Sequence, residues 1–290
     1  MKWLKRLLCL AGLLLLAAIA FGLLGLYLYH DTPSWYRKRV VTTQQSQDAA
    51  NSADQKLLDL FSWAASAHAQ QLRRLRGKLQ PSDQPIGLKT ITLSEDELNS
   101  FLNSWKTPGK NELNARISRY FTDGRVIFQP DAIILAGQSP EIDTLVSAEF
   151  DPSIDPQGNL RMPLGSLRAG RLPLPQAALA QPLGRLQYLL RQQLSREQTD
   201  ASIDPALAAN GPALTASWLR LLLSALNDTP ADPYLIIPFD MTHLNRGLPV
   251  KLTAINAAEG EVTLTMEPLV PGERDALVGR LKQPPASPNE

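Results

Sequence analysis

Carboxylates and histidines are the side chains in this sequence whose types could support acid–base or metal chemistry. Three carboxylates stand together at 95–97, and Asp240 precedes His243 by three residues. Grouped carboxylates can hold a cation or exchange protons, and a His–Asp pair can act as a general base. Ser94, however, stands three residues before Glu97, and this spacing is that of a capping box, which begins a helix. We therefore predict a structural role for the carboxylates at 95–97.

No pattern typical of a nucleophilic, nucleotide-binding or metal site occurs. Ser166 lacks the glycines of a G-x-S-x-G elbow, and the chain contains neither a P-loop nor a G-x-G-x-x-G motif. The turn at 155–159 lacks the alternating aspartates of a calcium loop. The histidines fall in separate predicted elements: His30, His68 and His243. We therefore predict no catalytic residues, no metal and no cofactor, and keep an envelope hydrolase with dispersed carboxylates as the weaker alternative.

An apolar segment at the N-terminus indicates membrane attachment. The run from Leu7 to Tyr29 carries no charge, and Lys2, Lys5 and Arg6 precede it. At a rise of ~1.5 Å per residue, such a helix spans the ~30 Å core of a bilayer. Residues 1–30 are therefore predicted to be an uncleaved signal anchor, a transmembrane helix that makes the bilayer a partner. The basic flank favours a cytoplasmic N-terminus and an extracytoplasmic body on a bacterial cytoplasmic membrane.

Cleavage of this segment is the alternative. Ala18-Ile19-Ala20 resembles a signal-peptidase site, but the apolar run continues beyond it to Leu28. Lipidation is disfavoured because Leu8, not a small residue, precedes Cys9. Cys9 is also the only cysteine, so an intramolecular disulfide is excluded. Both the retained anchor and the cleaved signal stay open at this point.

The charge of the body argues against a nucleic-acid partner. The whole chain carries +1, from 29 basic and 28 acidic residues. Without Lys2, Lys5 and Arg6, 26 basic residues face 28 acidic ones. A nucleic-acid-binding protein is expected to present a strongly basic face. We therefore expect no nucleic acid among the partners.

Periodicity divides the remainder of the chain into three regions. We assign 31–85 to a tether and an amphipathic stalk helix, because apolar residues recur every three or four positions over 53–79. Residues 86–270 are assigned to an extracytoplasmic α+β domain. Residues 271–290 end in a segment rich in proline and polar residues, and we assign this region to a disordered tail.

Within the domain, strand and helix patterns alternate. Ile91-Thr92-Leu93 is a short strand before the capped helix. Two β-rich apolar runs around a tight turn predict a hairpin over 126–135, and apolar and polar residues that alternate beside a turn predict another over 249–267. The predicted fold is a curved antiparallel sheet with helices packed on one face.

The segment 212–227 is apolar nearly all round, which is typical of a helix buried on several sides or touching another apolar body. We predict that it lines a ligand site, with a low-polarity wall formed by Trp218, Leu219, Leu222, Leu223 and Leu226.

Several stretches together resemble the YpmS-like family of single-pass bacterial membrane-anchored surface proteins. They are the anchor, the segment from Ile91 to Asn99, the hairpin from Phe128 to Gly137, Phe150-Asp151-Pro152 with Gly158-Asn159-Leu160, and Gly170 to Pro175. The resemblance covers about residues 90–176. It implies an extracytoplasmic α+β body on one transmembrane helix, with no catalytic residues to carry over.

These observations lead to two functional hypotheses beside the hydrolase. The first is a non-enzymatic envelope protein that binds a lipid or another hydrophobic ligand along 212–227. The second is a scaffold or assembly module that binds another envelope protein, with the 53–79 helix pairing with a partner helix.

Overall fold

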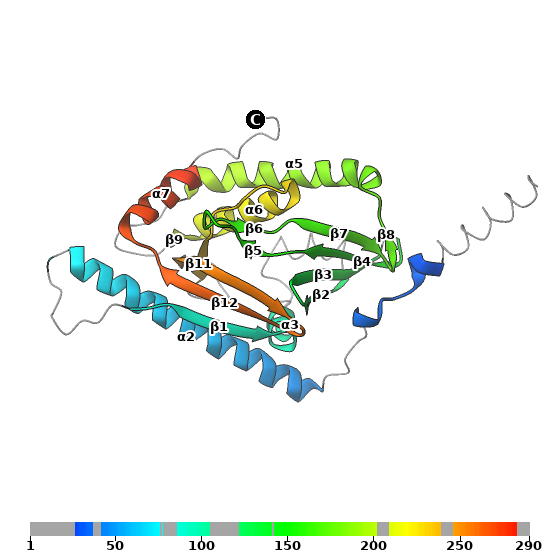
Figure 1. Cartoon of the computed structure of the whole chain (residues 1–290), viewed down its shortest axis with the longest axis horizontal. Coiled ribbons are helices and arrows are strands. Elements are labelled where there is room, and N and C mark those ends of the chain that lie inside the picture. The colour runs from blue at the N-terminus through cyan, green and yellow to red at the C-terminus, as the bar shows by residue number, and fades with distance from the viewer. Residues whose placement is uncertain are drawn as a thin grey trace, which may run out of the picture.

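The computed structural model describes residues 27–36, 42–75, 77, 86–104, 122–140, 142–201, 209–238 and 246–282. They form an α+β structure with curved antiparallel sheets, which confirms the predicted fold class (Figure 1). The helical elements are η1 (Ser34–Tyr36), α2 (Thr43–Leu75), α3 (Glu95–Ser104), α5 (Gln176–Asp200), α6 (Gly211–Asn227) and α7 (Pro271–Lys282). The strands are β1 (Lys89–Ser94), β2 (Thr122–Gln129), β3 (Ala132–Ser139), β4 (Thr144–Phe150), β5 (Ser153–Ile154), β6 (Leu160–Arg161), β7 (Leu164–Ala169), β8 (Leu172–Pro173), β9 (Ala209–Asn210), β10 (Tyr234–Pro238), β11 (Arg246–Ala258) and β12 (Glu261–Pro268).

The strands form two five-stranded sheets, so the prediction of a single curved sheet is wrong. The first sheet has the order β1-β12-β11-β10, and β9 also pairs with β11. The second sheet has the order β2-β3-β4-β7-β8, and β5 pairs separately with β6. Both predicted hairpins are present, as β2–β3 and β11–β12. Alternating residues identify a hairpin, but they do not say which hairpins share a sheet.

Backbone hydrogen bonds join the two sheets at their hairpin turns. Asp131, in the β2–β3 turn, donates its N–H to the carbonyl of Ala257 at 3.0 Å. Gly260, in the β11–β12 turn, donates to the carbonyl of Phe128 at 3.1 Å. Phe128 itself is buried in the core below the first sheet. The two sheets therefore share one apolar core.

A capping box starts α3, as the sequence predicts. The Ser94 N–H donates to Glu97 Oε2 at 2.8 Å, and the Glu97 N–H donates to Ser94 Oγ at 3.2 Å. The helix then covers the edge of the second sheet. The Asn99 side chain donates to the carbonyl of Val126 and accepts the Val126 N–H, at 2.6 and 2.8 Å. The exposed hydrogen-bonding groups of edge strand β2 are thereby satisfied at this residue.

Strand β10 lies between two apolar clusters. Leu235 and Ile237 join the cluster that contains Leu60 and Ala64 of α2. Ile236 joins the cluster formed by α5, α6 and α7. Because side chains alternate along a strand, these clusters lie on opposite faces of β10. The prediction that all helices pack on one face is therefore wrong at this strand.

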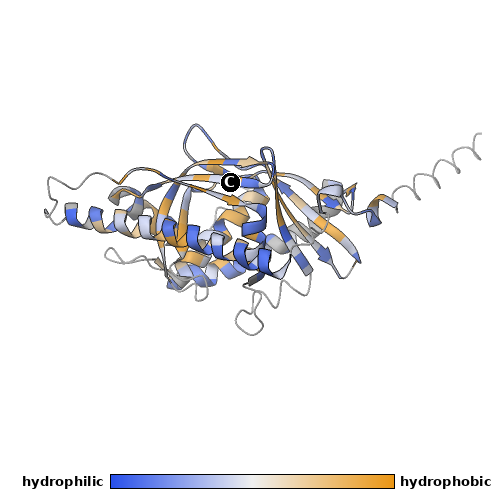
Figure 2. Cartoon of the chain, turned by 90° about the horizontal axis from the view of Figure 1, so that it is seen from below, coloured by the Kyte–Doolittle hydropathy of each residue, from blue (hydrophilic) through white to orange (hydrophobic). Residues whose placement is uncertain are grey.

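The long helix α2 is part of the body rather than a separate stalk. Its buried residues include Ala53, Leu60, Ala64 and Ala67. Figure 2 shows hydrophilic residues along the outward side of α2 and hydrophobic ones on the strands behind it. The helix is amphipathic as predicted, but its buried face is displaced from the predicted stripe. Of that stripe, Ala64 is buried and Phe61 packs against the core under the first sheet.

Two assignments along the chain need correction. Residues 271–282 form α7, and its Leu277 and Leu281 are buried against α6, so a disordered tail from 271 is wrong for this part. Residues 27–36 contact the second sheet instead of forming the start of a free tether; Tyr36 is buried there. The tail was placed too early because its evidence was the proline content, and the prolines cluster after 282.

Some predictions fall outside the described residues. They concern most of the anchor (residues 1–26, with Cys9), the pair Asp240 and His243, and the tail from 283. Among the described residues, no helix combines the length and apolar character needed to cross a membrane.

Candidate functional site

Helix α6 holds the residues that the sequence singled out for ligand binding. One side of it packs against α5 and α7, where Leu194, Leu277 and Leu281 are buried with it. Small residues on this side, including Ala213 and Ala216, are completely buried and let the neighbouring elements approach closely. Gln187 of α5 also donates a hydrogen bond to the carbonyl of Leu226 at 3.2 Å. These contacts fix α6 in place.

The structure separates the five predicted site residues into two groups. Leu219 and Leu223 are buried in the α5–α6–α7 core, and Leu226 is half-buried. Trp218 and Leu222 remain 47% and 42% exposed. Because they are four residues apart, Trp218 and Leu222 are neighbours on one outer face of the helix. Of the five predicted residues, only this pair therefore offers a largely exposed apolar surface to a ligand.

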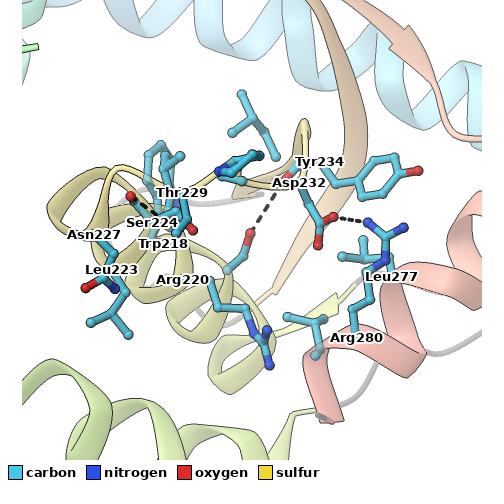
Figure 3. Close-up of a pocket in the computed structure, with 16 residues that line it drawn as sticks. Trp218, Arg220, Leu223, Ser224, Asn227, Thr229, Asp232, Tyr234, Leu277 and Arg280 are labelled. Atoms are coloured by element: carbon cyan, nitrogen blue, oxygen red, sulfur yellow. Dashed lines mark hydrogen bonds and ion pairs between the residues drawn. The ribbon is translucent and has the colours of Figure 1, made fainter. Parts of the chain in front are cut away.

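A cavity of about 280 Å³ lies beside α6. It is bounded by α6, the segment after its C-terminus, the start of β10, and α7 (Figure 3). Its walls carry both apolar and polar side chains, among them Trp218, Leu221, Arg220, Ser224, Asp232, Tyr234 and Arg280. Trp218 thus belongs both to the exposed face of the helix and to the cavity.

An ion pair and an aromatic ring form the polar wall. Arg280 of α7 and Asp232, just before β10, point toward each other and form an ion pair (Figure 3). The Arg280 guanidinium also lies 5.9 Å from the centre of the Tyr234 ring, within cation–π range. Burial, together with the nearby Glu273 carboxylate, raises the pKa of Tyr234. Its phenol therefore stays a neutral hydrogen-bonding group at physiological pH.

The apolar and cationic parts of the wall suit an amphiphile. Arg220, from the turn of α6 that carries Trp218, also lines the cavity, and burial lowers its pKa. Arginine is nevertheless a cation at neutral pH. Trp218 and Leu221 supply a low-polarity surface next to it. Among the described residues, no group of three or more His, Cys, Asp or Glu side chains is placed to hold a metal ion.

The carboxylates at 95–97 belong to a different part of the molecule. Burial alone would raise the pKa of Glu97, but hydrogen bonds from the Lys56 and Ser52 side chains and the Ser94 N–H lower it to about 2. Lys56 lies 2.7 Å from the carboxylate and Ser52 donates to it at 2.6 Å. A carboxylate held ionised in this way is a structural link, and it is not available as a general acid.

The other sequence candidates are engaged in local structure. Asp155 Oδ1 accepts the backbone N–H groups of Gln157 and Asn159, at 3.0 and 2.8 Å, so this carboxylate closes its own turn. Ser166 donates its hydroxyl to Glu149 at 2.7 Å, and that carboxylate also pairs with Arg168. Asp240 and His243 lie outside the described residues.

Sequence reasoning missed the polar wall. Asp232 precedes a proline, which indicates a turn and not a site, and Arg280 lies in the segment assigned to a tail. The Asp232–Arg280 ion pair joins residues 48 positions apart in the sequence, and no local sequence pattern predicts such a pair.

Comparisons of the chain with protein-family models, curated proteins and solved structures found no match.

Proposed function

We propose that this chain is a membrane-anchored, extracytoplasmic, non-enzymatic protein that holds an amphiphilic, lipid-like ligand beside α6. The observation that carries the proposal is the half-exposed Trp218, which lines a cavity together with Arg220 and Arg280. The exposed Leu222 lies one turn further along α6, on the outer face that Trp218 shares. Exposed aromatic and aliphatic side chains next to a cavity are typical of ligand sites. Function as an enzyme has less support, because no hydrogen bond joins a nucleophile to a base among the described residues that line the cavity.

The size of the cavity bears on the class of ligand. About 280 Å³ is just below the usual range of roughly 300–1,000 Å³ for small-molecule sites. A lipid exceeds this volume, so only part of it enters. We infer that a polar or anionic end lies near Arg220 and Arg280, while an acyl chain extends over Trp218 and Leu222.

Membrane attachment is supported by the uncharged run from Leu7 to Tyr29 with its basic flank. The order of motifs over about 90–176 supports the same topology through its resemblance to the YpmS-like family. A body held at a bilayer meets lipid at high local concentration. A site with modest affinity is then sufficient for occupancy.

A scaffold function is the second candidate, and the structure changes the surface on which a protein partner would be expected to bind. The apolar stripe of α2 covers the first sheet, where Leu60 and Ala64 are buried, so α2 is a poor partner helix. Tyr188 and Leu189 are instead exposed on α5. A protein partner would therefore be expected on α5, and this surface differs from the α6 site.

Native mass spectrometry of the full chain, transferred to mild detergent, tests the lipid proposal. We expect near-stoichiometric lipid on the wild-type chain, loss of it in Leu222→Asp, and retention in Leu58→Asp, which places the same charge on an exposed leucine of α2. Equal lipid content in both variants would contradict a site at α6. A lipid-free wild-type chain that captures another envelope protein on crosslinking would favour the scaffold.

A further inference from the structure

The end of the predicted anchor and the segment that follows it, residues 27–36, are attached to the second sheet, in part through their backbone. The Arg171 N–H donates to the carbonyl of Leu28 at 2.8 Å, and Thr144 Oγ1 donates to the carbonyl of Tyr29 at 2.5 Å. In return, the Tyr29 hydroxyl donates to the carbonyl of Ile142 at 3.0 Å. Leu28 and Tyr29 are therefore hydrogen-bonded to three parts of the second sheet: the start of β4, the β7–β8 turn and the β3–β4 connection.

Gly170 is the position that permits this approach. Its φ of +60° favours glycine, and a Cβ there would overlap the carbonyl oxygens of Leu28 and Tyr29. Any side chain at 170 must therefore push the segment away or distort the β7–β8 turn. Asp31 adds an ion pair to the next residue, with 3.0 Å between its carboxylate and Arg171 Nη1.

A second attachment point lies at the end of the segment. Tyr36 is buried with Ile127, Ile134 and Leu145 on the face of the second sheet opposite to Phe128. Its hydroxyl donates to the carbonyl of Asp123 at 2.9 Å, so the ring is fixed at both ends. Two attachment points on one sheet leave residues 27–36 little freedom to act as a hinge.

The exposed residues at this end indicate what lies beyond it. Tyr27 is 65% exposed and Ile142 is 45% exposed. Tyr29, the last residue of the uncharged run, is hydrogen-bonded to Ile142. If that run crosses a bilayer, its C-terminal end lies at the headgroup layer, where tyrosine is favoured. Ile142 must then lie at the same level.

We propose that residues 27–36 clamp the body onto the bilayer, so that Ile142 and the turn at Gly170 rest in the headgroup layer of the membrane that holds the anchor. The proposal rests on the membrane attachment proposed above. A body on a flexible tether could take many orientations, whereas the clamp fixes one. The C-terminal end of α2, the start of β1 and the start of α7 then lie at the end of the molecule farthest from the clamp (Figure 1).

Depth measurement with spin labels tests this proposal. In a full chain carrying Cys9→Ser, a nitroxide is attached at Ile142→Cys or, as the matched control, at Leu88→Cys, an exposed leucine just before β1. Both chains are reconstituted into phosphatidylcholine vesicles. We expect a several-fold lower collision rate with a water-soluble nickel reagent at 142 than at 88, and a higher collision rate with oxygen.

Variants of the clamp provide the internal control. Gly170→Ala is expected to raise the nickel collision rate of the label at 142 toward the rate at 88. Thr144→Val is expected to raise it partly, with less risk to folding.

Vesicle flotation separates the clamp proposal from the proposed membrane attachment. Equal collision rates at 142 and 88 in a chain that floats would overturn the clamp alone, whereas a chain that fails to float would overturn membrane attachment as well.

Discussion

Lys56 of α2 and Glu97 of α3 form an ion pair of 2.7 Å that ties the longest helix of the structure to the first turn of its neighbour. Glu97 is buried and simultaneously completes the capping box with Ser94. The Glu97 carboxylate thus interacts favourably with the positive end of the α3 helix dipole, and it also holds α2 against α3.

Glu97→Gln should lower the free energy of unfolding by about 1–3 kcal/mol, since it removes a charged partner of a buried hydrogen-bond network. The pKa of Glu97 in the folded protein, about 2, lies below its ordinary 4.5. The carboxylate therefore stabilises the fold above pH 4.5, and this contribution is lost as the pH falls from 4.5 toward 2. Urea unfolding followed by circular dichroism at several pH values measures both effects. Asp54→Asn, at an exposed position of α2, is the control; an equal loss in both variants would contradict this role.

Gly170→Ala and Gly158→Ala separate backbone strain from the contact with the membrane-proximal segment. Both glycines have positive φ, +60° and +81°, so both substitutions carry a strain cost of about 1 kcal/mol. A Cβ at 158 meets open space, whereas at 170 it meets the carbonyls of Leu28 and Tyr29. We expect the 170 variant to be the less stable by thermal unfolding and to be cleaved faster between residues 27 and 42 by protease. Identical behaviour would mean that the contact does not constrain the segment.

Leu277→Ala tests whether α7 belongs to the folded body. Leu277 is buried in the α5–α6–α7 core, so the substitution should lower stability by about 2–4 kcal/mol. Val270→Ala truncates an exposed side chain just before the helix and should change stability by less than about 0.5 kcal/mol. A Leu277 variant as stable as the wild-type chain would restore the interpretation of this region as a disordered tail.

Trp218→Ala and Leu223→Ala are expected to separate the loss of lipid binding from the loss of stability. Trp218 is half exposed, and its loss should reduce lipid binding with little change in unfolding free energy. Leu223 is buried, so its loss should cost about 2–5 kcal/mol. Chemical denaturation and lipid titration on the same preparations give both quantities. A stable Trp218 variant with unchanged binding would move the ligand away from α6.

Sequence reasoning succeeded where the determinants are local. The capping box at Ser94 and Glu97 was predictable because its spacing is fixed by one helical turn. The β11–β12 hairpin was predictable because Val262, Leu264 and Met266 alternate with polar residues around a turn at Gly260. The amphipathic character of the 53–79 helix follows from the same kind of pattern, whereas its packing against the first sheet was not predicted.

The remainder depended on contacts between distant residues. In 212–227, apolar residues surround the helix axis, so periodicity alone does not distinguish the buried Leu219 and Leu223 from the exposed Trp218 and Leu222. The Asp232–Arg280 pair and the docking of Tyr36 on the second sheet also join segments far apart in the chain. Arg280 and Tyr36 both lie in segments whose composition suggested a flexible tail or tether.

Photolabelling of the full chain in native-lipid vesicles tests the central claim most directly. A phospholipid that carries a photoreactive group near the end of its acyl chain is added, and labelled peptides are identified by mass spectrometry. Our account predicts label on 211–235 as well as on the anchor, with loss of the 211–235 label alone in Leu222→Asp and not in Leu58→Asp. Label confined to the anchor in the wild-type chain would contradict a ligand site beside α6.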